Sequence, residues 1–286
     1  MFFDTVVDIR IADPKGAKLL NDCFALCEEM ENTLSAHKES SELWKLNHRS
    51  ADTVEVSDDL AECIREGLYY GECSGGAFDI TVFPLRELWN FESEDAHVPS
   101  EAAIREALGH VDFGAVHIEG NEVHFDDPGT QIDLGGIAKG YIARKLNQYL
   151  RDQGCTCALI NLGGNVSAIG SRTDGNPWVI GIQQPFAERG TVGETVEIRD
   201  ESVISSGTYE RYFEQNGERY HHILDPFTGY PAQTALDQVT VIGSDEVLGD
   251  AFSTIGIVLG EENARRIAEE EGWDLDLIFQ YAEDSR

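Results

Sequence analysis

The N-terminal third of the chain changes from strand-like to helix-like spacing of its apolar residues. Residues 5–11 alternate apolar and polar positions, which predicts a β-strand, whereas residues 16–34 repeat apolar side chains at the spacing of a helix. A second helix is predicted over residues 58–72, with Ser57 as its N-cap. The chain therefore begins as a strand and then becomes helical.

The central part combines short elements with glycine-containing turns. Residues 101–108 predict a short helix, and residues 115–118 and 122–125 predict a hairpin that turns at residues 120–121, Gly-Asn. The apolar run at residues 131–134 predicts another short strand. A Gly-Gly pair follows this strand and leads into a helix with one apolar face.

The second half has the alternation and the turn residues of a β-rich region. Two helices, at residues 247–259 and 261–270, and a last strand at residues 275–279 follow it. No repeat and no linker divides the chain, so we expect residues 1–286 to form a single globular domain. The element order predicts an α+β fold with mixed, largely antiparallel sheets flanked by helices. The predicted strands of the β-rich region are residues 158–161, 166–170, 178–183, 195–198 and 239–242.

Charge and hydropathy exclude several classes of partner. The chain has 21 Lys and Arg against 53 Asp and Glu, a formal net charge of -32, which repels nucleic acid and anionic lipid. No apolar run is long enough to span a bilayer, and Asp4, Asp8 and Arg10 interrupt any signal-peptide core. We expect no nucleic-acid partner, no membrane insertion and a cytoplasmic location, or an extracytoplasmic one only if an N-terminal segment has been removed. The six cysteines contain no C-x-x-C pair and are expected to be buried or half-buried thiols.

The densest chemical signal lies at residues 133–141, DLGGIAKGY, between the predicted strand and helix. Glycines allow a ligand to approach the backbone, amides at a helix start bind anionic oxygen, and Lys139 adds a positive charge. These features favour a phosphate-bearing ligand, although the P-loop and G-x-G-x-x-G spacings are both absent. A glycine-rich turn with a surface lysine is an equally good interpretation of this segment alone.

Two further segments carry candidate catalytic groups. His222 precedes Asp225 by three residues in a turn that contains proline, so the imidazole and the carboxylate could act on a proton. Asp250 and Thr254 lie four residues apart on one helix face and offer the hard oxygen ligands that Mg²⁺ prefers. Taken singly, these segments are more often a structural turn and a helix cap.

Taken together and in chain order, these segments resemble the ApbE family of flavin transferases. The resemblance covers nearly the whole chain. It rests on the blocks at residues 35–47, 76–89, 133–141, 161–165, 205–209, 222–229 and 250–260.

The resemblance implies an enzyme that uses Mg²⁺ to transfer FMN from FAD to a threonine or serine of an acceptor flavoprotein and releases AMP. It implies metal ligation by Asp250, Thr254 and the backbone carbonyl of Gly136, with Ser253 where many members carry a further acid. Two departures, His37 for the usual tyrosine and Phe3-Asp4-Thr5 for Met-Gly-Thr, could change stacking on the flavin or adenine. The FAD contacts that it implies are Phe3, His37, Ala77, Phe78, Asp79, Asp133, Lys139 and Leu224.

The implied chemistry requires a positive site in an acidic protein. The FAD pyrophosphate repels an attacking hydroxyl unless Mg²⁺, Lys139 and helix-start amides neutralise its charge. His222 is the expected proton acceptor, with Asp225 as the alternative. Three rivals remain at this point: an FAD pyrophosphatase that gives FMN and AMP, a non-enzymatic flavin carrier, and an unrelated sugar- or nucleotide-phosphate enzyme.

Overall fold

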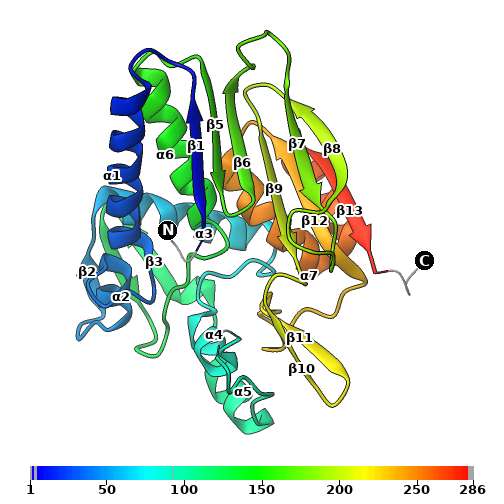
Figure 1. Ribbon diagram of the computed structural model, residues 1–286. Coiled ribbons are helices and arrows are strands. Elements are labelled where there is room, and N and C mark those ends of the chain that lie inside the picture. The colour runs from blue at the N-terminus through cyan, green and yellow to red at the C-terminus, as the bar shows by residue number, and fades with distance from the viewer. Residues whose placement is uncertain (1, 3–4, 92, 283–286) are drawn as a thin grey trace.

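A six-stranded antiparallel sheet forms the centre of the molecule (Figure 1). The computed structural model describes residues 2, 5–91 and 93–282. The N-terminal strand pairs with a strand from the middle of the chain, and the C-terminal strand closes the opposite edge. The sheet therefore joins the two ends of the chain into one core. Its order is β1 (Val7–Ile11), β5 (Cys157–Leu162), β6 (Asn165–Gly170), β9 (Ser202–Gly207), β12 (Leu236–Gly243) and β13 (Asp276–Tyr281).

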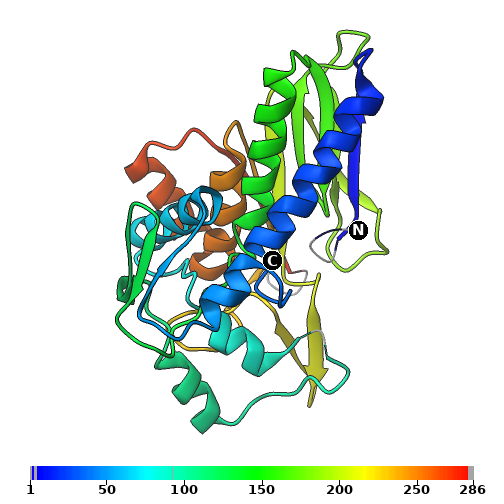
Figure 2. The ribbon, with the colours of Figure 1, turned by 90° about the vertical axis from the view of Figure 1, so that its left-hand side faces the viewer.

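Three helices, α1 (Gly16–Leu34), α6 (Ala138–Asp152) and α7 (Glu246–Glu271), pack on one face of this sheet (Figure 2). Apolar residues at helical spacing on α1 are buried, as the pattern predicted. Helix α7 contains Gly260 with a φ of 77°, which interrupts the helical backbone at the boundary between the two predicted helices.

A hairpin of β7 (Trp178–Gln183) and β8 (Val192–Ile198) packs against the other face of the sheet. This face has its own apolar core, so the strands in the middle of the sheet are buried on both sides. The core residues are Val166, Ala168, Val203 and Ile242 of the sheet with Ile180, Ile182 and Ile198 of the hairpin.

The remaining elements form the lower part of the molecule in Figure 1. Here Trp89 is fully buried among Phe91, Phe213, Tyr220 and Tyr230, and its indole N–H donates to the Gly229 carbonyl at 2.8 Å. This cluster fixes the hairpin β10–β11 against the helices beside it. The elements are α2 (Glu42–Asn47), α3 (Asp58–Cys73), α4 (Phe83–Trp89), α5 (Glu101–Leu108), the 3-10 turn Phe113–Ala115, the small sheet of β2 (Thr53–Glu55), β3 (Val116–Glu119) and β4 (Glu122–Phe125), and the hairpin of β10 (Tyr212–Gln215) and β11 (Glu218–His221).

The structure confirms the predicted α+β class and corrects one element. Residues 131–134 are not a strand, because Gln131 forms only a single bridge to Val82. The backbone of Ile132 instead bonds the side-chain amide of Asn47, at 2.7 and 2.8 Å. The six cysteines are free, and all but the half-buried Cys73 are buried. Among the described residues, no helix is both long and apolar enough to cross a membrane.

Candidate active site

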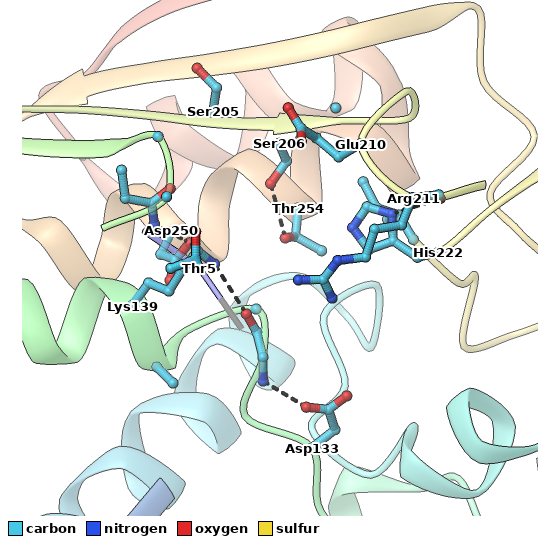
Figure 3. Close-up of a pocket in the computed structure, with 18 of the residues that line it drawn as sticks. Thr5, Asp133, Lys139, Ser205, Ser206, Glu210, Arg211, His222, Asp250 and Thr254 are labelled. Atoms are coloured by element: carbon cyan, nitrogen blue, oxygen red, sulfur yellow. Dashed lines mark hydrogen bonds and ion pairs between the residues drawn. The ribbon is translucent and has the colours of Figure 1, made fainter. Parts of the chain in front are cut away.

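A cavity of about 540 Å³ lies where the sheet ends meet α6, α7 and the lower part of the molecule (Figure 3). This volume is in the range of sites for small molecules and cofactors. Its lining comes from segments spread between Thr5 and Thr254, so it exists only when the whole chain is folded. Most of the residues expected to form the site line it: His37, Ala77, Phe78, Asp79, Asp133, Gly136, Lys139, His222, Leu224, Asp250 and Thr254.

The turn before α6 is organised by the Asp133 carboxylate. Its Oδ2 accepts a hydrogen bond from Arg86 Nη1 at 2.5 Å, and its Oδ1 accepts one from the Gly135 amide at 2.7 Å. Burial alone would raise the pKa of Asp133, but the Arg86 guanidinium and the Gly135 amide hold it below its usual value. Asp133 is therefore an anion that is already paired, and it places Arg86 at the cavity wall.

Asp250 is held between α6 and α7. The Gly140 amide donates to its Oδ2 at 2.9 Å, and the Asn165 side-chain amide donates to its Oδ1 at 2.8 Å. Lys139 Nζ lies 3.4 Å from the same Oδ1. A Cβ atom at Gly140 would lie 2.2 Å from the Glu246 carbonyl oxygen, so only glycine permits this approach of the two helices.

The oxygen donors near Asp250 suit a hard cation. Thr254 lies one turn further along α7, and a Cβ atom at Gly136 would be 3.6 Å from its Oγ1, so the Gly136 backbone is close to the Thr254 hydroxyl. One carboxylate, one hydroxyl and one carbonyl are a donor set that fits Mg²⁺ when phosphate and water complete the sphere. Within the described part of the chain, no group of three His, Cys, Asp or Glu side chains could hold a metal without such help.

Ser253 lies differently from the other expected metal ligands. Its side chain is fully buried and is not part of the cavity wall. The Ser253 hydroxyl donates to the Asp250 carbonyl at 2.9 Å and lies 2.7 Å from the Ser206 hydroxyl. It thus connects α7 to β9.

The expected flavin contacts form one wall. Phe78 and Leu224 give it an apolar surface, and Ala77 adds little bulk. The Asp79 carboxylate accepts bonds from the Thr81 amide and hydroxyl at 2.7 and 2.6 Å and from the Phe113 amide at 3.1 Å, so it holds the loop that carries Phe78. Burial raises the pKa of Asp79 even though these bonds oppose the change.

His37, another expected FAD contact, also lines the cavity. The ring of His37 lies 5.6 Å from that of Phe83 and is half exposed. Phe3 lies outside the described residues, whereas Thr5, its neighbour, lines the cavity.

His222 faces the cavity from the base of the hairpin β10–β11. Its Nδ1 lies 3.2 Å from the Arg211 carbonyl oxygen. Because a carbonyl oxygen only accepts hydrogen bonds, this contact selects the neutral ring in which Nδ1 carries the hydrogen and donates, and Nε2 is unprotonated. Burial, helped by the Arg211 guanidinium, lowers the pKa of His222 to about 3. The imidazole is therefore neutral and able to accept a proton.

The Asp225 carboxylate closes a turn of the backbone. Its carboxylate accepts bonds from the Phe227 amide at 2.8 Å and the Thr228 hydroxyl at 3.1 Å, which close the turn after β11. It is absent from the cavity wall, although its neighbours Leu224 and Pro226 are part of it.

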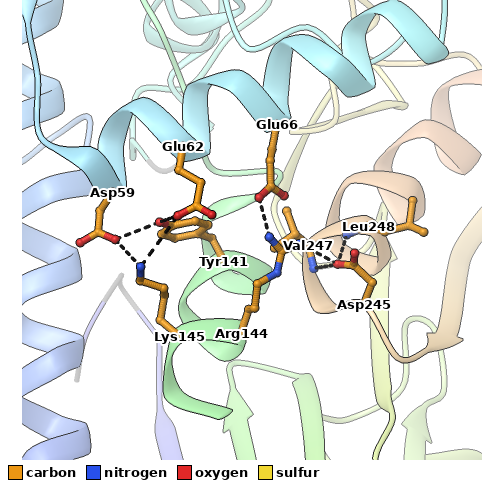
Figure 4. Close-up of polar contacts among 9 residues, drawn as sticks. All are labelled: Asp59, Glu62, Glu66, Tyr141, Arg144, Lys145, Asp245, Val247 and Leu248. Atoms are coloured by element: carbon orange, nitrogen blue, oxygen red, sulfur yellow. Dashed lines mark hydrogen bonds and ion pairs between the residues drawn. The ribbon is translucent and has the colours of Figure 1, made fainter. Parts of the chain in front are cut away.

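Ion pairs fix the helix that carries Lys139 (Figure 4). Arg144 on α6 contacts Glu66 of α3 at 2.5 Å and Asp245 at the start of α7 at 2.8 Å. Lys145 contacts Asp59 of α3 at 2.6 Å. These pairs are partly buried, so they hold α6 in register with both neighbours.

Sequence reasoning missed the three arginines of the cavity wall. Arg86, Arg189 and Arg211 line the wall together with Lys139, and Glu210 adds an acid. No spacing rule identifies such arginines, since each comes from a different segment. Two of them could have been suspected, because Arg86 falls inside the block at residues 76–89 and Arg211 follows the block at residues 205–209.

Comparison with known proteins gives one consistent family. The model of the ApbE family matches residues 3–279. A Klebsiella pneumoniae FAD:protein FMN transferase is 38% identical over 91% of this chain and 81% of its own length, and a Treponema pallidum relative of the same name is 36% identical over 91% and 76%. The structure of an ApbE protein from Thermotoga maritima has a TM-score of 0.88 at 32% identity, with 100% of this chain and 96% of that chain covered. The flavin transferase ApbE from Vibrio cholerae has a TM-score of 0.86 at 30% identity, with 98% and 91% covered.

Proposed function

The chain belongs to the ApbE family, and we propose that it transfers the FMN half of FAD, in the presence of Mg²⁺, to a threonine or serine hydroxyl of an acceptor flavoprotein and releases AMP. The relatives named FAD:protein FMN transferases support flavin transfer from FAD to protein. The metal, the acceptor hydroxyl and the release of AMP are our inference from the chemistry of the cavity.

The observation that carries the proposal is the concentration of cations in one cavity of an acidic protein. Arg86, Lys139, Arg189 and Arg211 line it together with four acids, so cations and acids are equal in number there, whereas the whole chain has a net charge of -32. The four acids are Asp79, Asp133, Glu210 and Asp250. Such a site favours a pyrophosphate and neutralises its charge where bond cleavage requires it. Because the wall also draws on residues from Thr5 to Thr254, we propose that the chain works as a single unit.

His222 is the proton acceptor in this proposal. The acceptor hydroxyl gives its proton to the unprotonated Nε2, and the Arg211 carbonyl holds the ring in this tautomer. The low pKa of His222 in the free protein makes it a weak base, but the negative charge of a bound pyrophosphate raises this pKa. Asp225 is left out of the chemistry because its carboxylate is engaged in the turn.

Asp250, Thr254 and Gly136 would hold Mg²⁺, whose chemistry is to withdraw charge from the phosphate oxygens. Lys139 lies on the same side of the cavity and would bind a second phosphate oxygen. Phe78 and Leu224 offer the apolar surface that an isoalloxazine ring requires.

The test is incubation of the purified protein with FAD, MgCl₂ and a candidate acceptor flavoprotein. We expect FMN on the acceptor by intact mass, AMP in equal amount, and loss of the adduct when the acceptor threonine is changed to alanine. FMN and AMP released at the same rate with and without acceptor would instead assign an FAD pyrophosphatase. Bound but intact FAD, with no difference between the wild type and Asp250→Asn, would assign a flavin carrier.

A further inference from the structure

Arg211 and His222 line the cavity and lie at the base of one β-hairpin. The ladder of β10 and β11 ends with Tyr212 opposite His221, and Arg211 and His222 form the next pair. The His222 amide donates to the Arg211 carbonyl at 3.0 Å, and His222 Nδ1 lies 3.2 Å from the same oxygen. The hairpin therefore holds the backbones of Arg211 and His222 side by side, and both residues line the cavity.

The guanidinium of Arg211 points into the cavity, on the side of Thr254 and Asp133 (Figure 3). Two other cavity cations have a carboxylate of the cavity as their partner. Arg86 lies 2.5 Å from Asp133, and Lys139 lies 3.4 Å from Asp250. Arg211 differs from Arg86 and Lys139 in its position. It lies on the same hairpin as the imidazole of His222, whereas the other two lie beside the carboxylates that organise α6 and α7.

We propose that Arg211 is a catalytic residue of the transfer, and that its guanidinium binds the non-bridging oxygens of the phosphorus that the acceptor hydroxyl attacks. This inference rests on the proposed function. In the step, the acceptor Oγ–P bond forms, the bond from phosphorus to the bridging oxygen breaks, and AMP leaves with that oxygen and its electron pair. The hydroxyl proton passes to His222.

The physical reason for an arginine is geometric. Its planar fork donates two parallel hydrogen bonds to two oxygens of one phosphoryl group, and it stays charged throughout the reaction. Because Arg211 and His222 are cross-strand neighbours, the cation and the base reach the same reacting phosphorus without any movement of the hairpin. Burial is the main cause of the lowered pKa of His222, and the positive charge of Arg211 lowers it further, so the imidazole of the free protein is neutral.

The first test compares Arg211→Gln, Arg211→Lys and Arg211→Ala with the control Arg219→Gln. Arg219 lies on the same hairpin, packs on Phe186 and Tyr212, and is not part of the cavity wall. We expect kcat to fall roughly 100- to 1,000-fold for Arg211→Gln, with a smaller loss for Arg211→Lys, while the Kd for FAD changes less than about tenfold. Arg219→Gln should keep wild-type kcat.

Chemical rescue separates catalysis from folding. Guanidinium chloride at millimolar concentration should restore part of the kcat of Arg211→Ala, whereas NaCl and urea should not. The acid limb of the kcat/KM profile of Arg211→Gln should move to higher pH, because removal of a neighbouring positive charge makes protonation of His222 easier.

Three outcomes overturn the inference: wild-type kcat in Arg211→Gln, an absence of rescue in a well-folded Arg211→Ala, or a loss that appears only in the Kd for FAD. A wild-type protein that releases neither FMN nor AMP from FAD would overturn the proposed function as well, which distinguishes the two failures.

Discussion

Lys139 offers the sharpest test of how the proposed metal and FAD sites are connected. Its Nζ lies 3.4 Å from Asp250 Oδ1, the oxygen that we expect to bind Mg²⁺. A lysine ammonium and a divalent cation cannot both stay at this oxygen, because they repel each other. We therefore expect Lys139 to move from Asp250 to the pyrophosphate when FAD binds, which leaves Asp250 available for the metal.

The magnitude follows from the distance and the burial. Two unit charges 3.4 Å apart interact with roughly 5 kcal/mol at an effective dielectric constant near 20. The Lys139 side chain is 30% exposed, and Asp250 keeps its bonds from Asn165 and Gly140, so only part of this energy is lost on exchange. We take about 1.4 kcal/mol as the net value, which is tenfold in affinity.

Lys139→Met should therefore bind Mg²⁺ about tenfold more tightly in the absence of FAD and bind FAD about ten- to a hundredfold more weakly. Calorimetric titration with MgCl₂ measures the first effect, and FAD fluorescence in EDTA measures the second. Wild-type protein should bind FAD more tightly with Mg²⁺ than with EDTA, and this coupling should shrink in the variant.

Lys18→Met is the matched control, because Lys18 forms an exposed pair with Asp22 on α1 and removal of its charge changes the net charge equally. If Lys139→Met without FAD binds Mg²⁺ as tightly as the wild type or more weakly, Lys139 does not compete with the metal for Asp250, and the proposed movement of Lys139 is refuted. Loss of affinity for FAD without any gain for Mg²⁺ would leave Lys139 as a phosphate ligand alone.

Three further predictions concern stability. Gly140→Ala should lower the free energy of unfolding by about 1–3 kcal/mol in urea titrations and reduce activity, because its Cβ would overlap the Glu246 carbonyl and push α6 from α7; unaltered stability would contradict the close packing. His221 is buried, and desolvation is the main cause that lowers its pKa to about 4. The free energy of unfolding should therefore fall by roughly 3 kcal/mol as the pH is lowered from 6.5 toward 4, and His221→Gln should flatten this part of the profile of stability against pH. KCl should raise the Tm by screening the repulsion of a net charge of -32, and a Tm independent of salt would show that the acids do not repel enough to matter.

The predictions from sequence succeeded where a local pattern determines the element. The helix at Gly16–Leu34, the N-cap at Ser57 and the hairpin around Gly120 follow from spacing and turn residues, and each has the predicted form. β9 was missed because four of the six residues in its sequence SVISSG are serine or glycine, although the sheet buries it between β6 and β12. Tertiary burial, which a local window does not contain, decided that strand.

The same limit applies to the site. Lys139, His222 and Asp250 belong to ordered blocks, so the resemblance found them, and the structure brings them to one cavity. Arg189 lies in the loop between β7 and β8, in a segment without any motif. It reaches the cavity only because that hairpin packs on the sheet. The engagement of Asp225 in its own turn was likewise invisible, since a carboxylate spaced for catalysis and one spaced for turn closure look alike in sequence.

The turn of the β10–β11 hairpin has a consequence for how this protein can change during evolution. Asn216 and Gly217 form a two-residue connection, and both have positive φ, at 57° and 84°. Such a turn sets the strand register, and a slip by one residue sends every following side chain to the opposite face. The imidazole of His222 is therefore positioned by counting back from Asn216-Gly217. Lineages can lengthen this hairpin by two residues on each strand and keep every side chain on its face, but a single insertion or deletion within it would rotate the base out of the cavity.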